Sequence, residues 1–382
     1  MPPKRVPEVY ARLGIKPAIN AQSWVTALGG SIMRPEVVQA MADASTCFVD
    51  MIELNRKAGE AVARACGAPA GMVTNGCSAA QTVSVAAIMT GGDPAKVEQL
   101  PNSAGMKNEV LIFKGERNRY DMAFELPGAK LVEWGMLGGA RTWQLESAIT
   151  DKTACIATVF SPFIKRGLPV SELAAAGRKH GIPVIVDAAA EVPPMTNLTR
   201  FLKEGADLVM FSGGKGIGGP QGAGLLAGRK DLIEAAFENN LNLHSPRAGI
   251  GRGMKVTREE LVGMVTALEL YLESDETAVI AGWQKKAESV HSRLQGIPGL
   301  RVVIEPFSSN RHGPQPVVYF EKEWKGPTPA EIRKRLLAGD PPIHVGGGGY
   351  GDEINLVMVN VQDGEEKIIA DRLLEILRPA KK

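Results

Sequence analysis

The chain has 382 residues, with 44 lysines and arginines against 42 aspartates and glutamates, so its formal net charge is +2. Hydrophobic residues make up 44% and charged residues 23%, which excludes a disordered chain. The length predicts roughly two domains. The near-neutral charge argues against a dedicated nucleic-acid-binding protein, because no basic excess is present to neutralise phosphates.

The four cysteines lie too far apart to form a disulfide framework, which favours a reducing compartment. The first residues lead into no apolar signal segment, and no apolar run reaches the length of a membrane span. We therefore expect a cytoplasmic protein with no membrane partner. The five histidines never fall at metal-ligand spacing, so no metal site is expected.

In chain order, residues 1–45 read as an N-terminal arm or a part of the small domain, irregular up to residue 34. A large domain is predicted over 46–275, in which apolar strands alternate with helices. Such alternation indicates an α/β domain with a mostly parallel sheet covered on both faces. Its expected elements are helices 35–44 (at the end of the arm), 50–66, 77–90, 142–149 and 171–180, the last with Ser171 as N-cap, and strands 71–74, 110–113, 130–133, 154–160, 182–186, 207–211 and 222–227.

The pattern changes after a helix that starts at Thr257, where Thr257-Arg-Glu-Glu260 fits a capping box. This long helix is the expected connector to a small C-terminal α+β domain over 276–382. The expected elements of that domain are strands 300–305, 316–321 and 354–361 and helices 329–338 and 364–377.

The densest candidate site is the glycine-rich segment Phe211–Gln221, with Lys215 between two pairs of glycines directly after a predicted strand. In open parallel sheets the ligand crevice lies at the carboxyl ends of the strands. A lysine there suits Schiff-base chemistry, and a solvated loop lysine is the alternative. The same segment matches a dinucleotide pattern, but Pro220 and a strand follow instead of a helix.

Two further features point to the same crevice. Asp187 ends the apolar run 182–186, where its carboxylate suits the protonated ring nitrogen of pyridoxal phosphate; a helix N-cap is the alternative. The segment Thr74–Gln81 forms a strand–turn–helix junction of small residues, which suits a phosphate at a helix N-terminus. Ordinary close packing is the alternative there.

Several segments together resemble the selenocysteine-synthase-like (SelA-like) family, and within it the D-glucosaminate-6-phosphate ammonia-lyase branch. The resemblance rests on residues 184–194 and 207–233, with shorter segments at 19–21, 28–31, 117–121 and 251–256. It implies a fold-type I pyridoxal-phosphate-dependent enzyme, aspartate-aminotransferase-like, that forms a homodimer or a higher dimer-based assembly.

The resemblance also implies roles for individual residues. Lys215 would carry the cofactor as a Schiff base, and Asp187 would bind the pyridine nitrogen. The other implied cofactor contacts are Ala189 against the ring and Gly76, Cys77, Ser78 and Ser212 near the phosphate. Arg119, Arg247 and Arg252 are candidates for binding an anionic substrate, with surface arginines as the alternative.

The implied reaction is an α,β-elimination that releases ammonia and forms a keto acid from a hydroxylated amino acid or amino-sugar acid, with or without a phosphate. Racemisation, epimerisation or aldol cleavage of a small amino acid is the alternative within this class. A selenium transferase that acts on tRNA is less favoured for two reasons. The net charge is only +2, and the resemblance starts almost at the first residue, so the tRNA-handling N-terminal domain of true bacterial selenocysteine synthases is not expected. A non-catalytic protein on this fold is a further alternative, but the presence of both Lys215 and Asp187 argues against it.

Overall fold

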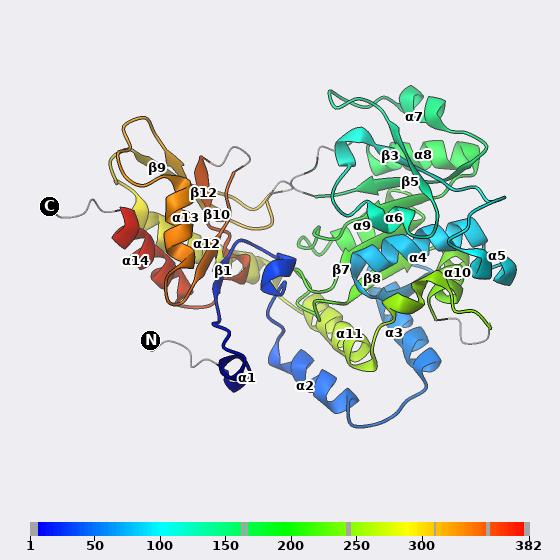
Figure 1. The fold of residues 1–382 in the computed structure, drawn as a ribbon, viewed down its shortest axis with the longest axis horizontal. Helices are drawn as coiled ribbons and strands as arrows, with labels where there is room; N and C mark the ends of the chain where they lie inside the picture. Colours follow the sequence, from blue (N-terminus) through cyan, green and yellow to red (C-terminus); the bar gives the residue numbers. More distant parts are fainter. Residues whose placement is uncertain are drawn as a thin grey trace. The chain divides into compact units, whose positions relative to one another are not determined.

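The computed structural model describes residues 7–161, 164, 167–241, 246–308, 311–348 and 352–377. The chain divides into two compact units, which are described separately below. One unit is Ser31–Ser274, and the other combines Met1–Gly30 with Asp275–Lys382. The N-terminal segment therefore contributes to both units (Figure 1).

The unit Ser31–Ser274 is built around a seven-stranded sheet with the strand order β2-β8-β7-β6-β5-β3-β4. Only β8 runs against its neighbours, so the sheet is mostly parallel, as predicted. The strands are β2 (Ala70–Thr74), β3 (Glu109–Phe113), β4 (Lys130–Trp134), β5 (Thr153–Val159), β6 (Val184–Asp187), β7 (Leu208–Ser212) and β8 (Gly224–Gly228).

Helices cover both faces of this sheet (Figure 1). One face packs against α4 (Gly76–Thr90) and α10 (Lys230–Asn240). The opposite face packs against α3 (Met51–Cys66), α7 (Thr142–Ala148), α8 (Val170–His180), α9 (Asn197–Lys203) and α11 (Arg258–Leu272). The remaining helical segments of the unit are α2 (Pro35–Ala44), α5 (Pro94–Gln99), α6 (Met122–Glu125), η2 (Lys114–Glu116) and η3 (Ile250–Met254).

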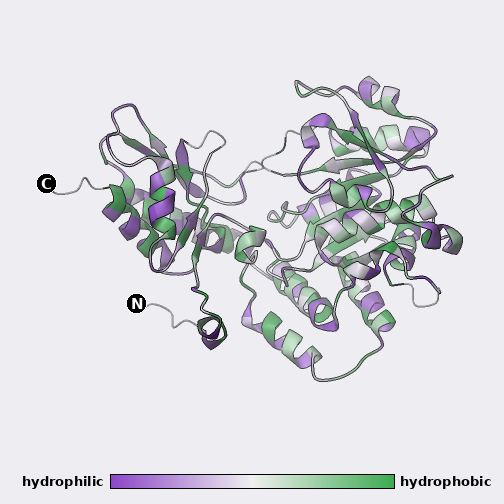
Figure 2. Ribbon diagram, in the orientation of Figure 1, coloured by the Kyte–Doolittle hydropathy of each residue, from purple (hydrophilic) through white to green (hydrophobic). Residues whose placement is uncertain are grey.

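The central strands are apolar on both faces, which explains why their sequences read as continuous hydrophobic runs (Figure 2). In β6, Ile185 packs into the core on the α4 side, whereas Val186 packs into the core on the α3 side. Both side chains are fully buried. Burial on two faces fixes the register of the strand and therefore the position of the residue that ends it.

The unit formed by Met1–Gly30 and Asp275–Lys382 has a small antiparallel sheet in the order β12-β10-β9 and a separate parallel pair of β1 with β11. Its helices and strands share one apolar core. The elements are α1 (Glu8–Arg12), β1 (Ile19–Ala21), η1 (Thr26–Leu28), α12 (Glu276–Leu294), β9 (Leu300–Glu305), β10 (Gln315–Phe320), α13 (Pro329–Leu337), β11 (Ile343–Val345), β12 (Glu353–Asn355), η4 (Met358–Asn360) and α14 (Glu365–Leu377).

Two local predictions were wrong, and helix α12 was not predicted. The helix predicted from Thr257 ends at Leu272, and α12 begins after Asp275, whose carboxylate caps it by accepting the Ala278 N–H at 3.0 Å. The strand predicted over 354–361 ends at residue 355 and gives way to the short helical turn η4. Ser171 is not an N-cap, because α8 already begins at residue 170 after a proline.

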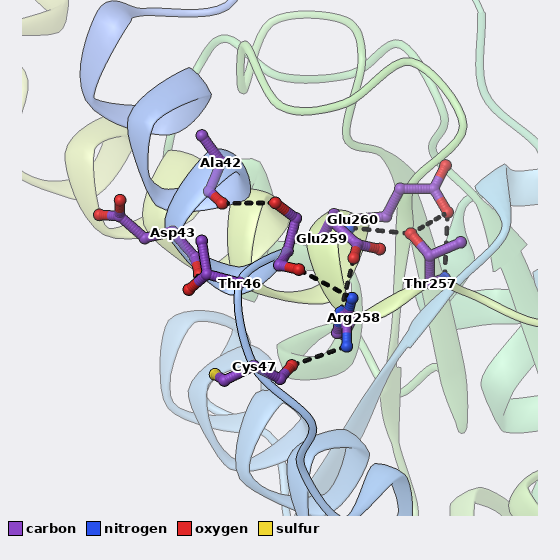
Figure 3. Close-up of polar contacts among 9 residues, drawn as sticks. Ala42, Asp43, Thr46, Cys47, Thr257, Arg258, Glu259 and Glu260 are labelled. Carbon is purple, nitrogen blue, oxygen red and sulfur yellow. Dashed lines mark hydrogen bonds and ion pairs between the residues drawn. The ribbon is translucent and has the colours of Figure 1, made fainter.

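The start of α11 has the predicted capping box (Figure 3). The Thr257 hydroxyl accepts the Glu260 N–H at 3.2 Å, and the Glu260 carboxylate accepts the Thr257 N–H at 3.1 Å. The neighbouring Arg258 guanidinium donates to the carbonyls of Cys47 at 2.6 Å and Ser45 at 3.0 Å. These bonds fix the start of α11 against the segment between α2 and α3.

A search of the described residues finds no helix that is both long and apolar enough to cross a membrane.

Replacing the cap of α11 tests this account of the helix start. We expect Thr257→Ala to lower the free energy of unfolding by about 1 kcal/mol, because the N–H of Glu260 loses its acceptor. Thr257→Ser keeps a hydroxyl and should retain most of that stability. Urea denaturation measures both variants, and equal stability of Thr257→Ala and the wild type would contradict the assigned cap.

Candidate active site

Three strands bring the predicted site residues to one edge of the central sheet. The strands β2, β6 and β7 run in the same direction, so their carboxyl ends meet at the same edge. Thr74 at the end of β2 and Ser212 at the end of β7 both pair with Gly224 of β8. Asp187 ends β6 in register with Met210 of β7. The sheet thus gathers the candidate residues, as the sequence predicted.

Asp187 is a buried carboxylate with a defined hydrogen-bond donor on each oxygen. Its side chain is 6% exposed. The Ala189 backbone N–H donates to Oδ1 at 2.9 Å, and the Gln81 Nε2 donates to Oδ2 at 2.6 Å. A carboxylate has about four lone-pair sites, so each oxygen keeps room for a further donor.

The pKa of Asp187 is raised above its ordinary value, because burial disfavours the charged form. The Ala189 N–H, the charge of Lys215 and the Gln81 N–H each lower the pKa and so oppose this effect. The charge of Asp121 raises it further. The protein therefore holds a costly negative charge at this point and surrounds it with donors and a cation.

Lys215 lies in a hydrogen-bonded loop directly after β7. The loop folds back on itself through the Gly219 N–H, which donates to Gly213 O at 2.8 Å, and the Gly218 N–H, which donates to Lys215 O at 3.0 Å. Ser31 donates both its N–H and its hydroxyl to the carbonyl of Gly214, at 3.0 and 3.1 Å. The backbone next to Lys215 is therefore fixed both by hydrogen bonds within its own loop and by hydrogen bonds from Ser31.

The glycines around Lys215 are needed mainly for packing within the protein. A Cβ at Gly216 would lie 2.0 Å from the Val192 carbonyl oxygen, and one at Gly214 would lie 2.4 Å from the Gln221 Cα. The neighbours that exclude a side chain at these two positions belong to the chain itself.

The N-terminus of α4 carries the three predicted phosphate-binding residues, Gly76, Cys77 and Ser78. Gly76 has a φ of 71°, a left-handed conformation that favours glycine. A Cβ added there would meet only the Gly222 carbonyl oxygen, at 3.7 Å. Because the first backbone N–H groups of a helix have no partner within it, this end of α4 suits an anion.

Electrostatic effects connect the helix end with the other candidates. Burial raises the pKa of the Cys77 thiol well above its ordinary value, the negative charge of Asp187 raises it further, and Lys215 lowers it. The charge of Lys215 also acts on Asp187. These three residues therefore lie within electrostatic range of one another.

The remaining predicted residues fall into two groups. Ala189 and Ser212 are half-buried at the sheet edge and bonded to each other, since the Ser212 N–H donates to Ala189 O at 3.2 Å. The side chains of Arg119, Arg247 and Arg252 are exposed. The Arg119 guanidinium lies 5.9 Å from the centroid of the Tyr120 ring.

Sequence reasoning missed two polar contacts. Gln81 and Ser31 both lie in segments that were singled out, but neither had been given a role. A glutamine in the second turn of an otherwise small and apolar helix was the available signal for Gln81. In the described part of the chain, no group of three or more His, Cys, Asp or Glu side chains is arranged to hold a metal ion.

Comparison with known proteins agrees with this geometry. Residues 19–282 match the family model described as SelA, L-seryl-tRNA selenium transferase. The chain is 35% identical to D-glucosaminate-6-phosphate ammonia lyase of Salmonella typhimurium over 98% of this chain and 99% of that protein. It is 32% identical to 5'-C-glycyluridine monooxygenase-decarboxylase of a Streptomyces species, over 96% and 92% of the two chains.

The solved structure of a D-glucosaminate-6-phosphate ammonia-lyase superposes with a TM-score of 0.83 at 34% identity and covers 97% of this chain and 98% of that one. More distant structures with the same fold include aminotransferases, and the fold is that of the fold-type I pyridoxal-phosphate-dependent enzymes. The predicted fold class is confirmed. On this sequence and structural agreement, the chain belongs to the SelA family.

Proposed function

We propose that this protein is a pyridoxal-phosphate-dependent ammonia-lyase that acts on a hydroxylated, phosphorylated amino-sugar acid such as D-glucosaminate 6-phosphate. The observation that carries the proposal is the similarity to the ammonia lyase over nearly the full length of both chains. The buried Asp187, its donors and the nearby lysine support it, because they form the polar set that such a reaction needs.

The residues at the sheet edge fit the cofactor chemically. Asp187 keeps lone pairs for a ring N–H, the first N–H groups of α4 suit a phosphate, and Lys215 supplies a primary amine. Ala189 would lie against the ring, and Ser212 would assist at the phosphate. When bound, pyridoxal phosphate withdraws electrons from the carbon next to the substrate amine and so makes its proton removable.

The chain's own groups then do the proton transfers. The amine of Lys215, which would be released when the substrate amine takes its place on the cofactor, would act as general base and take the α-proton of the substrate. The same group, now protonated, would return a proton to the departing β-hydroxyl. Water lost at this step is regained on hydrolysis, so the net products are a keto acid and ammonia. No oxidant or reductant is needed.

The anionic end of the substrate requires cations. We assign Arg119, Arg247 and Arg252 as candidates, since their side chains are cationic and exposed. A dimer-based assembly is part of the proposal.

The covalent role of Lys215 is tested by trapping. Incubation with pyridoxal phosphate followed by borohydride should leave one reduced adduct on Lys215, located by peptide mass spectrometry. Lys215→Ala should lose the adduct and lower the turnover rate by about 10²- to 10⁴-fold. Lys203→Ala, which removes an exposed lysine of α9, is the matched control and should retain both. An adduct that persists in Lys215→Ala would refute the assignment.

The reaction class is tested by product analysis with D-glucosaminate 6-phosphate. We expect ammonia and keto acid in equal amounts, at the same rate with and without dioxygen, because elimination consumes no oxidant. Oxygen consumption with loss of carbon dioxide would instead favour a reaction like that named for the Streptomyces relative. Inversion of the substrate without ammonia would favour a racemase or epimerase.

The cost of the buried charge is tested with Asp187→Asn. Because burial raises the pKa of Asp187, folding stability falls as the pH rises through that pKa and the carboxyl ionises. Asp187→Asn should therefore increase the unfolding temperature of the cofactor-free protein at alkaline pH while it lowers turnover. This stability gain should shrink as the pH falls. A variant less stable than the wild type at every pH would contradict the assigned cost.

A further inference from the structure

Gln81 connects the helix at the candidate phosphate site with the carboxylate at the ring site. It lies on α4, 106 residues before Asp187, and its side chain is only 1% exposed. Its Nε2 donates to Asp187 Oδ2 at 2.6 Å, and hydrogen bonds to an ionised acceptor are shorter and stronger than those between neutral groups. A polar side chain buried this deeply requires such a partner.

The two donors to Asp187 are of different kinds. The Ala189 N–H belongs to the backbone only two residues away, so it cannot be removed without disturbing the turn. The amide of Gln81 reaches the other oxygen from a separate helix. Together they fix the plane of the carboxylate, and Gln81 is the donor that a substitution can remove.

The amide of Gln81 has one oxygen without a hydrogen-bond partner in the structure. This oxygen, Oε1, is buried, whereas the amide nitrogen donates its hydrogen bond to Asp187. The reverse orientation of the amide would set two acceptors against each other if Asp187 is ionised. The charged form of Asp187 therefore selects the orientation in which the amide nitrogen donates.

We propose that Gln81 is a positioning residue, which holds the Asp187 carboxylate in the one orientation that accepts the N–H of the bound pyridine ring. This inference rests on the proposed function. Gln81 itself need not contact the reacting atoms, because it acts through Asp187. The neighbouring Thr82 has a different role, since its hydroxyl donates to Ala123 O at 2.7 Å and so connects α4 with α6.

If Gln81 acts through its hydrogen bond to Asp187, its effect on stability and on cofactor binding must depend on pH, whereas a packing role would give no such dependence. In the cofactor-free protein it stabilises the ionised form of Asp187 more strongly than the neutral form, so its effect is largest at high pH and weakens as the pH falls. In the protein with cofactor, Asp187 stays ionised beside the ring and the effect is present throughout. The penalty on cofactor binding must therefore grow as the pH falls.

The experiment compares wild type, Gln81→Met and the control Thr82→Val from about pH 5 to about pH 9, a range in which buried carboxyls with raised pKa values titrate. One measurement is the free energy of unfolding of the cofactor-free protein. The other is the dissociation constant for pyridoxal phosphate, followed by its absorbance. Methionine matches glutamine in length, so the loss of the amide is the main change.

For Gln81→Met we expect a stability deficit that is largest at high pH and a cofactor dissociation constant that rises about 10- to 100-fold relative to wild type at low pH, the usual effect of a hydrogen bond to a charged group. The two trends run in opposite directions with pH. For Thr82→Val, neither the stability difference from wild type nor the change in the cofactor dissociation constant should vary with pH, because the hydroxyl of Thr82 does not contact Asp187.

If the stability deficit and the change in the cofactor dissociation constant of Gln81→Met do not vary with pH, the proposal is overturned and Gln81 is a packing residue. Equal trends in Thr82→Val would overturn it as well. Failure of the wild type to bind pyridoxal phosphate would instead refute the proposed function. The stability measurement would still report whether Gln81 controls the charge of Asp187, so the two failures are distinguishable.

Discussion

The buried negative charge of Asp187 is the constraint on which the proposed site depends. Burying an ionised carboxylate carries a large desolvation free energy. Two N–H donors and the nearby charge of Lys215 offset part of it. Each compensating group comes from a different segment: Gln81 from α4, Ala189 from the turn after β6 and Lys215 from the loop after β7. The position of Asp187 thus fixes the relation between these three segments.

Helix α4 carries two parts of the proposed site on one rigid element. Its first residues form the candidate phosphate site, and Gln81 lies five residues further along. At 1.5 Å per residue the two positions lie about 7.5 Å apart along the helix axis. One helix therefore sets the spacing between the group that binds phosphate and the group that orients the ring partner.

Much of this arrangement was predictable because it depends on sequence-local signals. Apolar runs that end in Asp187 and Ser212 predicted buried parallel strands, and parallel strands bring their ends to one edge. Gln81 stood out as a glutamine in a small-residue helix, but its partner was not predictable, because Asp187 lies 106 residues away and only the packing of α4 on the sheet brings the two together. The atoms that exclude side chains at the glycines around Lys215, such as the Val192 carbonyl, also come from another segment, so sequence spacing could not identify them.

The most direct test of the central claim is the protonation state of the ring nitrogen in the bound cofactor. Pyridoxal phosphate labelled with ¹⁵N at the ring can be bound to the wild type and to Asp187→Asn and examined by NMR. We expect a protonated ring nitrogen in the wild type at neutral pH and an unprotonated one in the variant. An unprotonated nitrogen in the wild type, or the same signal in both proteins, would contradict the assignment of Asp187.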